Sequence, residues 1–161
     1  IKTRTFPQKY YVDNSYWQQP NGPIFLFISG EGSVIKTTAV DTNLVTAALN
    51  GSPDEQSGPE VLRLAMVSHK GSINIILMLV EFGAKIIALE HRYYGDSIPT
   101  ADLSTSNLQW LSSKQALYDI AMFITKYKEA NGLQNNAWFT FGCSYSGALS
   151  GTLYIFNLII I

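Results

Sequence analysis

The run Phe141-Gly142-Cys143-Ser144-Tyr145-Ser146-Gly147 places one serine between small residues two positions before and two positions after it. A serine hydroxyl is a weak nucleophile unless it is positioned and loses its proton as it attacks. A tight turn from a strand into a helix, with the serine at its tip, provides the positioning, and small flanking residues let the two backbones approach. Gly142 fits this pattern, and Ser146 replaces the second glycine of G-x-S-x-G but is small enough for the packing. The run therefore predicts Ser144 as the nucleophile of an acyl-transfer reaction.

Acyl transfer also needs hydrogen-bond donors for the oxyanion, which in such a site are backbone N–H groups. The N–H of Tyr145, directly after the serine, is the first candidate donor. Gly30 is our choice for the second, because it follows an apolar run and lets the backbone come close. Glu31, the next residue, is a further donor candidate and a candidate contact for a substrate amine. Cys143 is a rival nucleophile, but we interpret it as a small packing residue, since reactive thiols need a helix N-terminus beside a histidine.

Three apolar runs bounded by turn residues predict buried strands that position these groups: Pro23–Ser29, Ala84–Glu90 and Ala137–Phe141. A helix is expected between the last two, starting at Ser112, which has a glutamine three residues later, and ending at Asn131-Gly132. A second, shorter helix is expected over Ile73–Glu81, with Gly83 ending it. This alternation predicts an α/β fold with a parallel sheet.

Composition narrows the function classes. The chain has 161 residues, 47% of them hydrophobic and 14% charged, with a net charge of -1, which indicates a globular domain and no nucleic-acid partner. The apolar runs are much shorter than the ~20 residues of a membrane span. One cysteine excludes an internal disulfide. We identify no cofactor or metal motif.

Four segments together resemble one peptidase family. They are Pro23–Gly32, Ala88–Pro99, Leu111–Asp119 and Phe141–Leu149, and the opening from Phe6 to Trp17 is similar to the start of the same family's mature domain. The set resembles the serine carboxypeptidase family of lysosomal Pro-X carboxypeptidase, dipeptidyl peptidase II and thymus-specific serine protease. The run Glu90-His91-Arg92-Tyr93-Tyr94-Gly95, within the second segment, is the most specific part of the resemblance.

The resemblance implies an α/β-hydrolase fold and a serine-type exopeptidase, secreted or lysosomal/vacuolar, that cleaves peptides with proline near a terminus. It carries the nucleophile over to Ser144 and leaves dimerisation open. It does not decide between a carboxypeptidase and a dipeptidyl peptidase. Asn50-Gly51-Ser52 matches the sequon for N-glycosylation of a secreted protein.

The chain also departs from the family pattern. In this fold the order is Ser, then Asp or Glu, then His, yet residues 145–161 contain no Asp, Glu or His. We therefore expect residues 1–161 to be the N-terminal part of a hydrolase domain, with an unmatched insertion at about 36–72. We assign His69 to a solvated loop and His91 to a structural role. We expect Glu90 and Arg92 to bond around the strand end and Asp119 to be a surface or capping carboxylate.

Two alternatives to the exopeptidase remain at this stage. In the first, the chain alone is a catalytically inactive or binding-only fragment. In the second, it is an esterase, because an elbow does not distinguish ester from amide chemistry. The Glu90–Gly95 run argues against the esterase.

Overall fold

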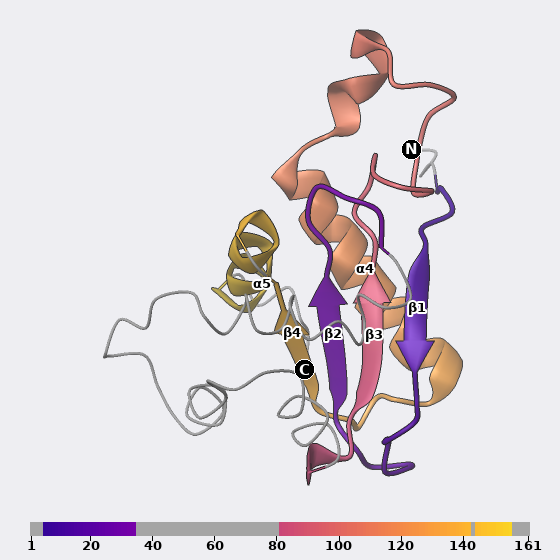
Figure 1. Ribbon diagram of the computed structural model, residues 1–161, viewed down its shortest axis with the longest axis vertical. Helices are drawn as coiled ribbons and strands as arrows, with labels where there is room; N and C mark the ends of the chain where they lie inside the picture. Colours follow the sequence, from indigo (N-terminus) through magenta and orange to yellow (C-terminus); the bar gives the residue numbers. More distant parts are fainter. Residues whose placement is uncertain (1–4, 35–80, 143, 156–161) are drawn as a thin grey trace.

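The computed structural model describes residues 5–34, 81–142 and 144–155. A sheet at its centre has the strand order β1-β3-β2-β4, with β1 at Tyr10–Asp13, β2 at Ile24–Ile28, β3 at Lys85–Leu89 and β4 at Trp138–Phe141. Strand β2 pairs in parallel with both β3 and β4, whereas β1 runs antiparallel to β3 (Figure 1). The described sheet is therefore mixed.

The three predicted strands are confirmed as the parallel part of this sheet, and the antiparallel edge strand β1 was not predicted. Every residue of β2 and β3 is buried, whereas β1 has one exposed and three half-buried residues. Burial on both faces produces the continuous apolar runs that made β2 and β3 recognisable. The short strand β1 lacks such a run, so its sequence resembles that of a loop.

Two core clusters lie on opposite faces of the sheet. Alternate residues of β2 and β3 contribute to each cluster, because successive side chains of a strand point to opposite faces. One cluster contains Ile24, Leu26, Ile28, Ile87 and Leu89 from the strands, together with residues of both long helices. The other contains Phe25, Phe27, Val34, Ala84, Ile86 and Ala88, with Phe141 of β4 packed against it.

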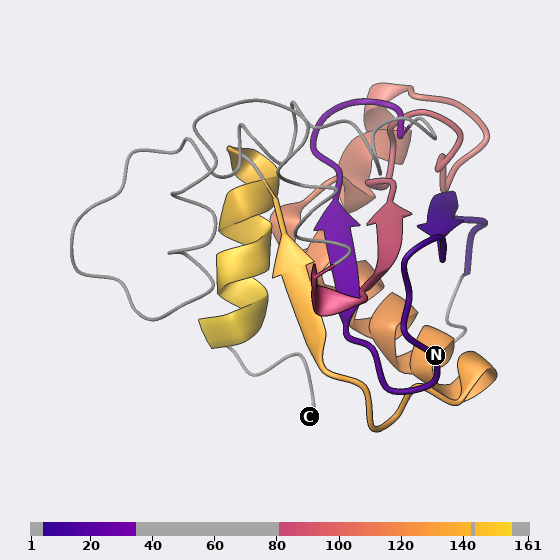
Figure 2. The same ribbon diagram turned by 60° about the horizontal axis from the view of Figure 1, so that its bottom comes forward.

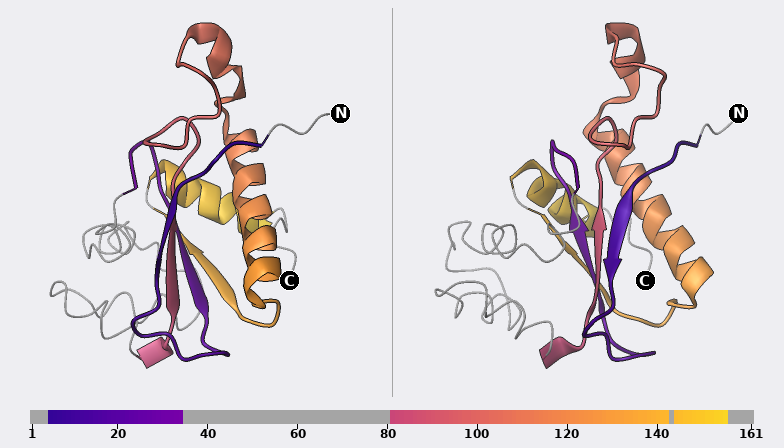
Figure 3. Two further views of the ribbon diagram at one scale, coloured as in Figure 1. Left: turned by 90° about the vertical axis from the view of Figure 1, so that its right-hand side faces the viewer. Right: turned by 45° about the vertical axis from the view of Figure 1, so that its right-hand side comes forward.

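Helix α4 (Ser113–Asn131) lies along one face of the sheet (Figure 3). Its predicted ends are confirmed. The Ser112 hydroxyl accepts a hydrogen bond from the Gln115 N–H at 3.3 Å, and Gly132 takes the left-handed conformation at φ 67°. The helix buries Ala116, Ile120 and Ile124 against the strands, so a capped amphipathic helix covers β2 and β3.

Helix α5 (Tyr145–Ile155) leaves β4 almost at once and packs on the same face as α4, beside β4 (Figure 2). It buries Leu149 and Leu153. It begins at Tyr145, one residue after Ser144. The turn between strand and helix is thus as tight as the elbow pattern requires.

The segment between β3 and α4 contains the 3-10 helix η2 (Thr105–Trp110) and projects beyond the carboxyl ends of β2 and β3 (Figure 1). The predicted insertion at 36–72 and most of the predicted helix at 73–81 lie outside the described residues, as do His69 and Asn50. Residues 81 and 82 are helical, and Gly83 follows with φ 54°, as expected for the end of that helix. No helix in the described ranges is long and apolar enough to span a membrane.

Candidate active site

The parallel pairing of β2 with β4 brings the two predicted site segments together. Phe27 pairs with Phe141, so both strands end at the same edge of the sheet. The loop after β2 carries Gly30, and the turn after β4 carries Ser144. A Cβ placed on Gly30 would lie 3.9 Å from the Ser146 Oγ, in ordinary contact. Gly30 therefore lies directly against the start of α5.

Ser144 has the backbone geometry of a nucleophile elbow. It is exposed at the tip of the turn and has φ 54°, one of two non-glycine residues in the described ranges with a positive φ. A side chain in this region costs on the order of 1–3 kcal/mol and is kept only where the surroundings force it. Such strain is concentrated at functional sites, and a nucleophile elbow has its serine on a strained turn of this kind.

Gly142 is the residue that permits this turn. A Cβ added there would lie 2.2 Å from the Ser146 carbonyl oxygen and 2.7 Å from the Gly147 nitrogen. Both contacts are with backbone, which cannot rotate away as a side chain can. The strand and the helix therefore approach so closely that only glycine fits two residues before Ser144, as the sequence pattern predicted.

The start of α5 supplies N–H groups at this turn. The first residues of a helix have N–H groups without an intrahelical acceptor and lie at the positive end of its dipole. Tyr145 is the first residue of α5, and the Ala148 N–H donates to the Ser144 carbonyl at 3.0 Å. The Tyr145 N–H thus belongs to a position suited to a developing negative charge beside Ser144.

The Tyr145 side chain ties the elbow to the loop after β3 and to the start of α4. Its hydroxyl lies 3.2 Å from the His91 Nε2 and 3.2 Å from the Ser113 Oγ. The rings of His91 and Tyr145 meet edge to face at 5.5 Å. The residue directly after Ser144 is therefore held from two other elements, which limits the movement of the turn.

His91 is engaged at both ring nitrogens. Its Nδ1 lies 2.7 Å from the Arg92 carbonyl oxygen, which can only accept, so Nδ1 carries a proton. Burial lowers the pKa of His91, more than the hydrogen bond to the Arg92 carbonyl raises it. The other ring nitrogen, Nε2, lies 3.2 Å from the Tyr145 hydroxyl, so both nitrogens of the ring have polar neighbours. This is a structural arrangement, as the sequence predicted, because a general base for Ser144 needs a free nitrogen that points at the serine.

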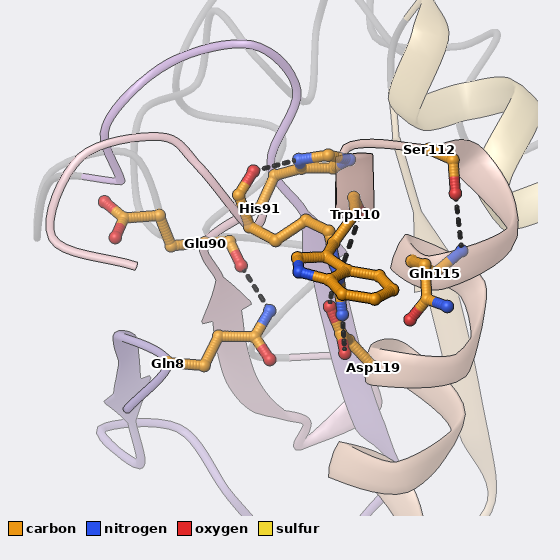
Figure 4. A network of polar contacts seen from close by, with 8 residues as sticks. Gln8, Glu90, His91, Trp110, Ser112, Gln115 and Asp119 are labelled. Atoms are coloured by element: carbon orange, nitrogen blue, oxygen red, sulfur yellow. Dashed lines mark hydrogen bonds and ion pairs between the residues drawn. The ribbon is translucent and has the colours of Figure 1, made fainter. Parts of the chain in front are cut away.

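Arg92 forms a bidentate ion pair with Asp119 of α4, and Figure 4 labels Asp119 and Trp110 in the surrounding network. Its Nε and one terminal nitrogen donate to the two Asp119 oxygens, both at 2.6 Å, and the other terminal nitrogen donates to the Trp110 carbonyl at 2.9 Å. The side chains are only 7% and 15% exposed. The prediction that Asp119 is a surface or capping carboxylate is therefore wrong, because Asp119 faces inward and neutralises a buried guanidinium.

Glu90 is also bonded at the strand end, as expected, with its carboxylate fully buried. Its backbone carbonyl accepts from the Gln8 amide at 2.6 Å (Figure 4). Sequence reasoning missed the particular partners of residues 90–92, because each partner lies in a distant segment. The predicted parallel sheet could have indicated that the loops after its strands lie close together, since the carboxyl ends of parallel strands meet at one edge.

Of the remaining candidate residues, one lies within the described ranges and two lie outside them. Glu31 is exposed in the loop after β2, so its side chain is accessible at the site edge. Cys143 lies outside the described residues, like the sequon at Asn50. Within the described ranges, no three side chains of the His, Cys, Asp and Glu types lie close enough together to hold a metal ion.

Comparison with known proteins identifies similar chains. The sequence model of the family described as Serine carboxypeptidase S28 matches residues 65–155, more than half of the chain. A probable serine protease of Arabidopsis thaliana is 37% identical over 155 residues, which cover 91% of this chain and 25% of the relative.

Two human proteins are also similar. Thymus-specific serine protease is 32% identical over 148 residues, covering 91% of this chain and 23% of the relative. Lysosomal Pro-X carboxypeptidase is 28% identical over 151 residues, covering 91% of this chain and 24% of the relative. The chain thus spans about a quarter of the length of these curated relatives.

Proposed function

The chain belongs to the serine carboxypeptidase S28 family, and from this premise we propose that it acts in serine-type peptide hydrolysis, with Ser144 as the nucleophile. The observation that carries the proposal is the backbone of Ser144, an exposed serine with φ 54° between β4 and α5. Family membership supports the reaction class, and the elbow geometry supports the choice of residue. Esterase activity is a weaker candidate, because the family match and its named relatives favour amide substrates.

In this proposal the Ser144 Oγ attacks the carbonyl carbon of a peptide bond, the C–N bond breaks, and the amine leaves with the proton that the serine gives up. Water then hydrolyses the acyl-enzyme, which releases the carboxylic acid and restores the serine hydroxyl. The oxyanion accepts hydrogen bonds from the N–H of Tyr145 and the N–H of Gly30. The position of Tyr145 at the start of α5 supports the first role. The position of Gly30, where an added Cβ would lie 3.9 Å from the Ser146 Oγ, supports the second. Each such donor contributes about 10²–10³ in rate where it has been removed in other enzymes.

The substrates we propose are peptides with proline near a terminus, and the compartment is secretory or lysosomal. One relative carries the words lysosomal and Pro-X carboxypeptidase in its name, which supports both choices. A carboxypeptidase and a dipeptidyl peptidase differ in the end of the peptide they hold. Glu31 is the proposed contact for a substrate amine, and Glu31→Gln should then weaken cleavage only of substrates with a free N-terminus.

The alternative proposal is that this 161-residue chain by itself is inactive or only binds. The observation that favours it is the engagement of His91 at both ring nitrogens, which leaves this histidine unsuited to activate Ser144. A serine without a base reacts slowly with any acyl donor. The reactivity of the serine therefore separates the two proposals.

A fluorophosphonate probe followed by peptide mapping tests the nucleophile. We expect modification of Ser144, loss of labelling in Ser144→Ala, and unchanged labelling in Cys143→Ala. Labelling that persists in Ser144→Ala refutes the assignment, and a folded chain that is not labelled supports the inactive alternative. Cleavage of a proline-containing peptide amide, compared with a simple ester, then separates a peptidase from an esterase.

A further inference from the structure

The carboxylate of Glu90 joins the two loops that follow β2 and β3. The side chain is fully buried at the carboxyl end of β3, where a carboxylate is unfavourable unless its oxygens are hydrogen-bonded. One oxygen accepts from the Val34 N–H at 2.9 Å. The other accepts from the Asp96 N–H at 3.0 Å and from the Ser97 hydroxyl at 2.7 Å. All three partners are donors, so the site fits an acceptor-only group.

The bond to Val34 fixes one end of the loop that carries Gly30. At the other end, the Ser29 N–H donates to the Leu89 carbonyl at 2.9 Å. Both ends of the loop are therefore tied to consecutive residues, Leu89 and Glu90, at the end of β3. Residues 31–33 between the two ties are exposed. The segment is therefore anchored at both ends. At the Val34 end, the Glu90 carboxylate binds the backbone N–H and the core buries the side chain.

The close approach of this side chain depends on Gly95. A Cβ on Gly95 would lie 2.0 Å from a Glu90 oxygen and 2.6 Å from its carboxyl carbon. Gly95 also has φ 54°, a conformation that glycine adopts without strain. The loop after β3 is thus shaped to enclose the carboxylate, which indicates that its position is defined rather than incidental.

We propose that Glu90 is a positioning residue for the oxyanion site. By holding the Val34 N–H it sets the course of residues 29–34 and so the direction of the Gly30 N–H. Glu90 itself is buried and does not touch the substrate. The proposal rests on the proposed function of Gly30 as an oxyanion donor, and it adds the group that holds this donor in place.

Glu90→Gln tests the proposal, with Ser97→Ala as the matched control. The Gln side chain has one acceptor oxygen and presents an NH₂ group to partners that are themselves donors. Ser97→Ala removes the buried hydrogen bond to Glu90 and the acceptor of the Lys9 N–H, but it leaves the bond between Glu90 and Val34 intact. The two variants therefore differ in whether the Val34 N–H keeps the Glu90 carboxylate as its acceptor.

Two measurements are made on each variant of the full chain. Hydrogen exchange of the amides of residues 29–34 reports the support, and the rate at which a fluorophosphonate labels Ser144 reports the oxyanion site. We expect Glu90→Gln to speed exchange in this loop and to slow labelling about tenfold, less than the 10²–10³ for a donor lost entirely. Ser97→Ala should leave both close to the wild-type values.

The outcomes are distinguishable. If the amides of residues 29–34 exchange equally fast in the two variants, Glu90 does not hold the loop after β2. If exchange is faster in Glu90→Gln but labelling of Ser144 is not slower, Glu90 does not position the oxyanion donor. If the wild-type chain is not labelled, the proposed function fails, while exchange still decides whether Glu90 holds the loop. Glu90→Asp keeps an acceptor-only carboxylate with a shorter reach. It replaces Glu90→Gln if that variant does not fold, and we expect the same direction of change in exchange.

Discussion

Gly142→Ala should disrupt the elbow more than any other glycine substitution at this end of the sheet. The added Cβ would lie 2.2 Å from the Ser146 carbonyl oxygen and 2.3 Å from its carbon, whereas ordinary contact begins at 3.4 Å. Because both atoms are backbone, β4 and α5 must move apart by about 1 Å in a close-packed region. We expect a loss near the upper end of the overpacking range, about 3 kcal/mol. For a chain of this size, that lowers the melting temperature by about 6–12 °C.

The same displacement acts on the nucleophile. A misplacement of about 1 Å in a reacting group reduces rates roughly 10²-fold, so labelling of Ser144 by a fluorophosphonate should slow by about that factor. Thermal unfolding and labelling kinetics are measured on the same samples, below the melting temperature of the variant. Slow labelling in a folded sample then reports geometry and not unfolding.

Two glycines of α5 provide graded controls. A Cβ on Gly147 would lie 3.1 Å from the Gly142 carbonyl oxygen, which is tight but far less severe than the clash at Gly142, and a Cβ on Gly151 would meet nothing within 4 Å. Gly151→Ala should stabilise the helix by about 0.5–1 kcal/mol, and Gly147→Ala should be nearly neutral. If Gly142→Ala melts and labels like Gly151→Ala, the close approach of strand and helix is refuted.

Three further predictions concern the elements around the elbow. Asp119→Asn leaves the buried Arg92 guanidinium without its countercharge. Chemical denaturation should show a decrease of about 3–5 kcal/mol in the free energy of unfolding, and a smaller decrease for the double variant in which Arg92 is also replaced by Met. Burial lowers the pKa of His91, so the unfolded chain binds its proton first. Stability should therefore fall as the pH drops through the ordinary value of 6.5 towards the lower native pKa, and His91→Gln should flatten this part of the pH–stability curve. Ser112→Ala removes the N-cap of α4 and should cost about 1 kcal/mol by thermal unfolding, whereas Ser106→Ala in η2, which removes no cap, should cost little.

Local chemistry explains which parts of the fold were predictable. The strands β2 and β3 are buried on both faces, so their sequences are continuous apolar runs. Helix α4 carries its own signals, a capping serine and a terminating glycine. The elbow is equally local, because Gly142 and Ser144 are constrained by neighbours within a few residues. These features were all recognisable without knowledge of the rest of the chain.

The missed features depend on distant segments. Strand β1 is defined by pairing with β3, and its own residues are only partly buried. The sequence alone indicates a surface position for Asp119 on an amphipathic helix, because its partner Arg92 lies 27 residues earlier in the chain. The contact between His91 and Tyr145 spans 54 residues. Each of these requires the strand order, which composition and periodicity do not provide.

The run Glu90–Gly95, the most specific part of the family resemblance, also supplies contacts between the elements around the candidate site. Glu90, His91 and Arg92 follow β3, and consecutive residues at a strand end point in different directions. Glu90 bonds to the loop after β2, His91 to Tyr145 of the elbow, and Arg92 to Asp119 of α4. An exposed, strained Ser144 needs such support, because strain is retained only where the surroundings determine the backbone. Three different side chains that reach three different elements supply it, which gives a physical reason for an unusual succession of residue types.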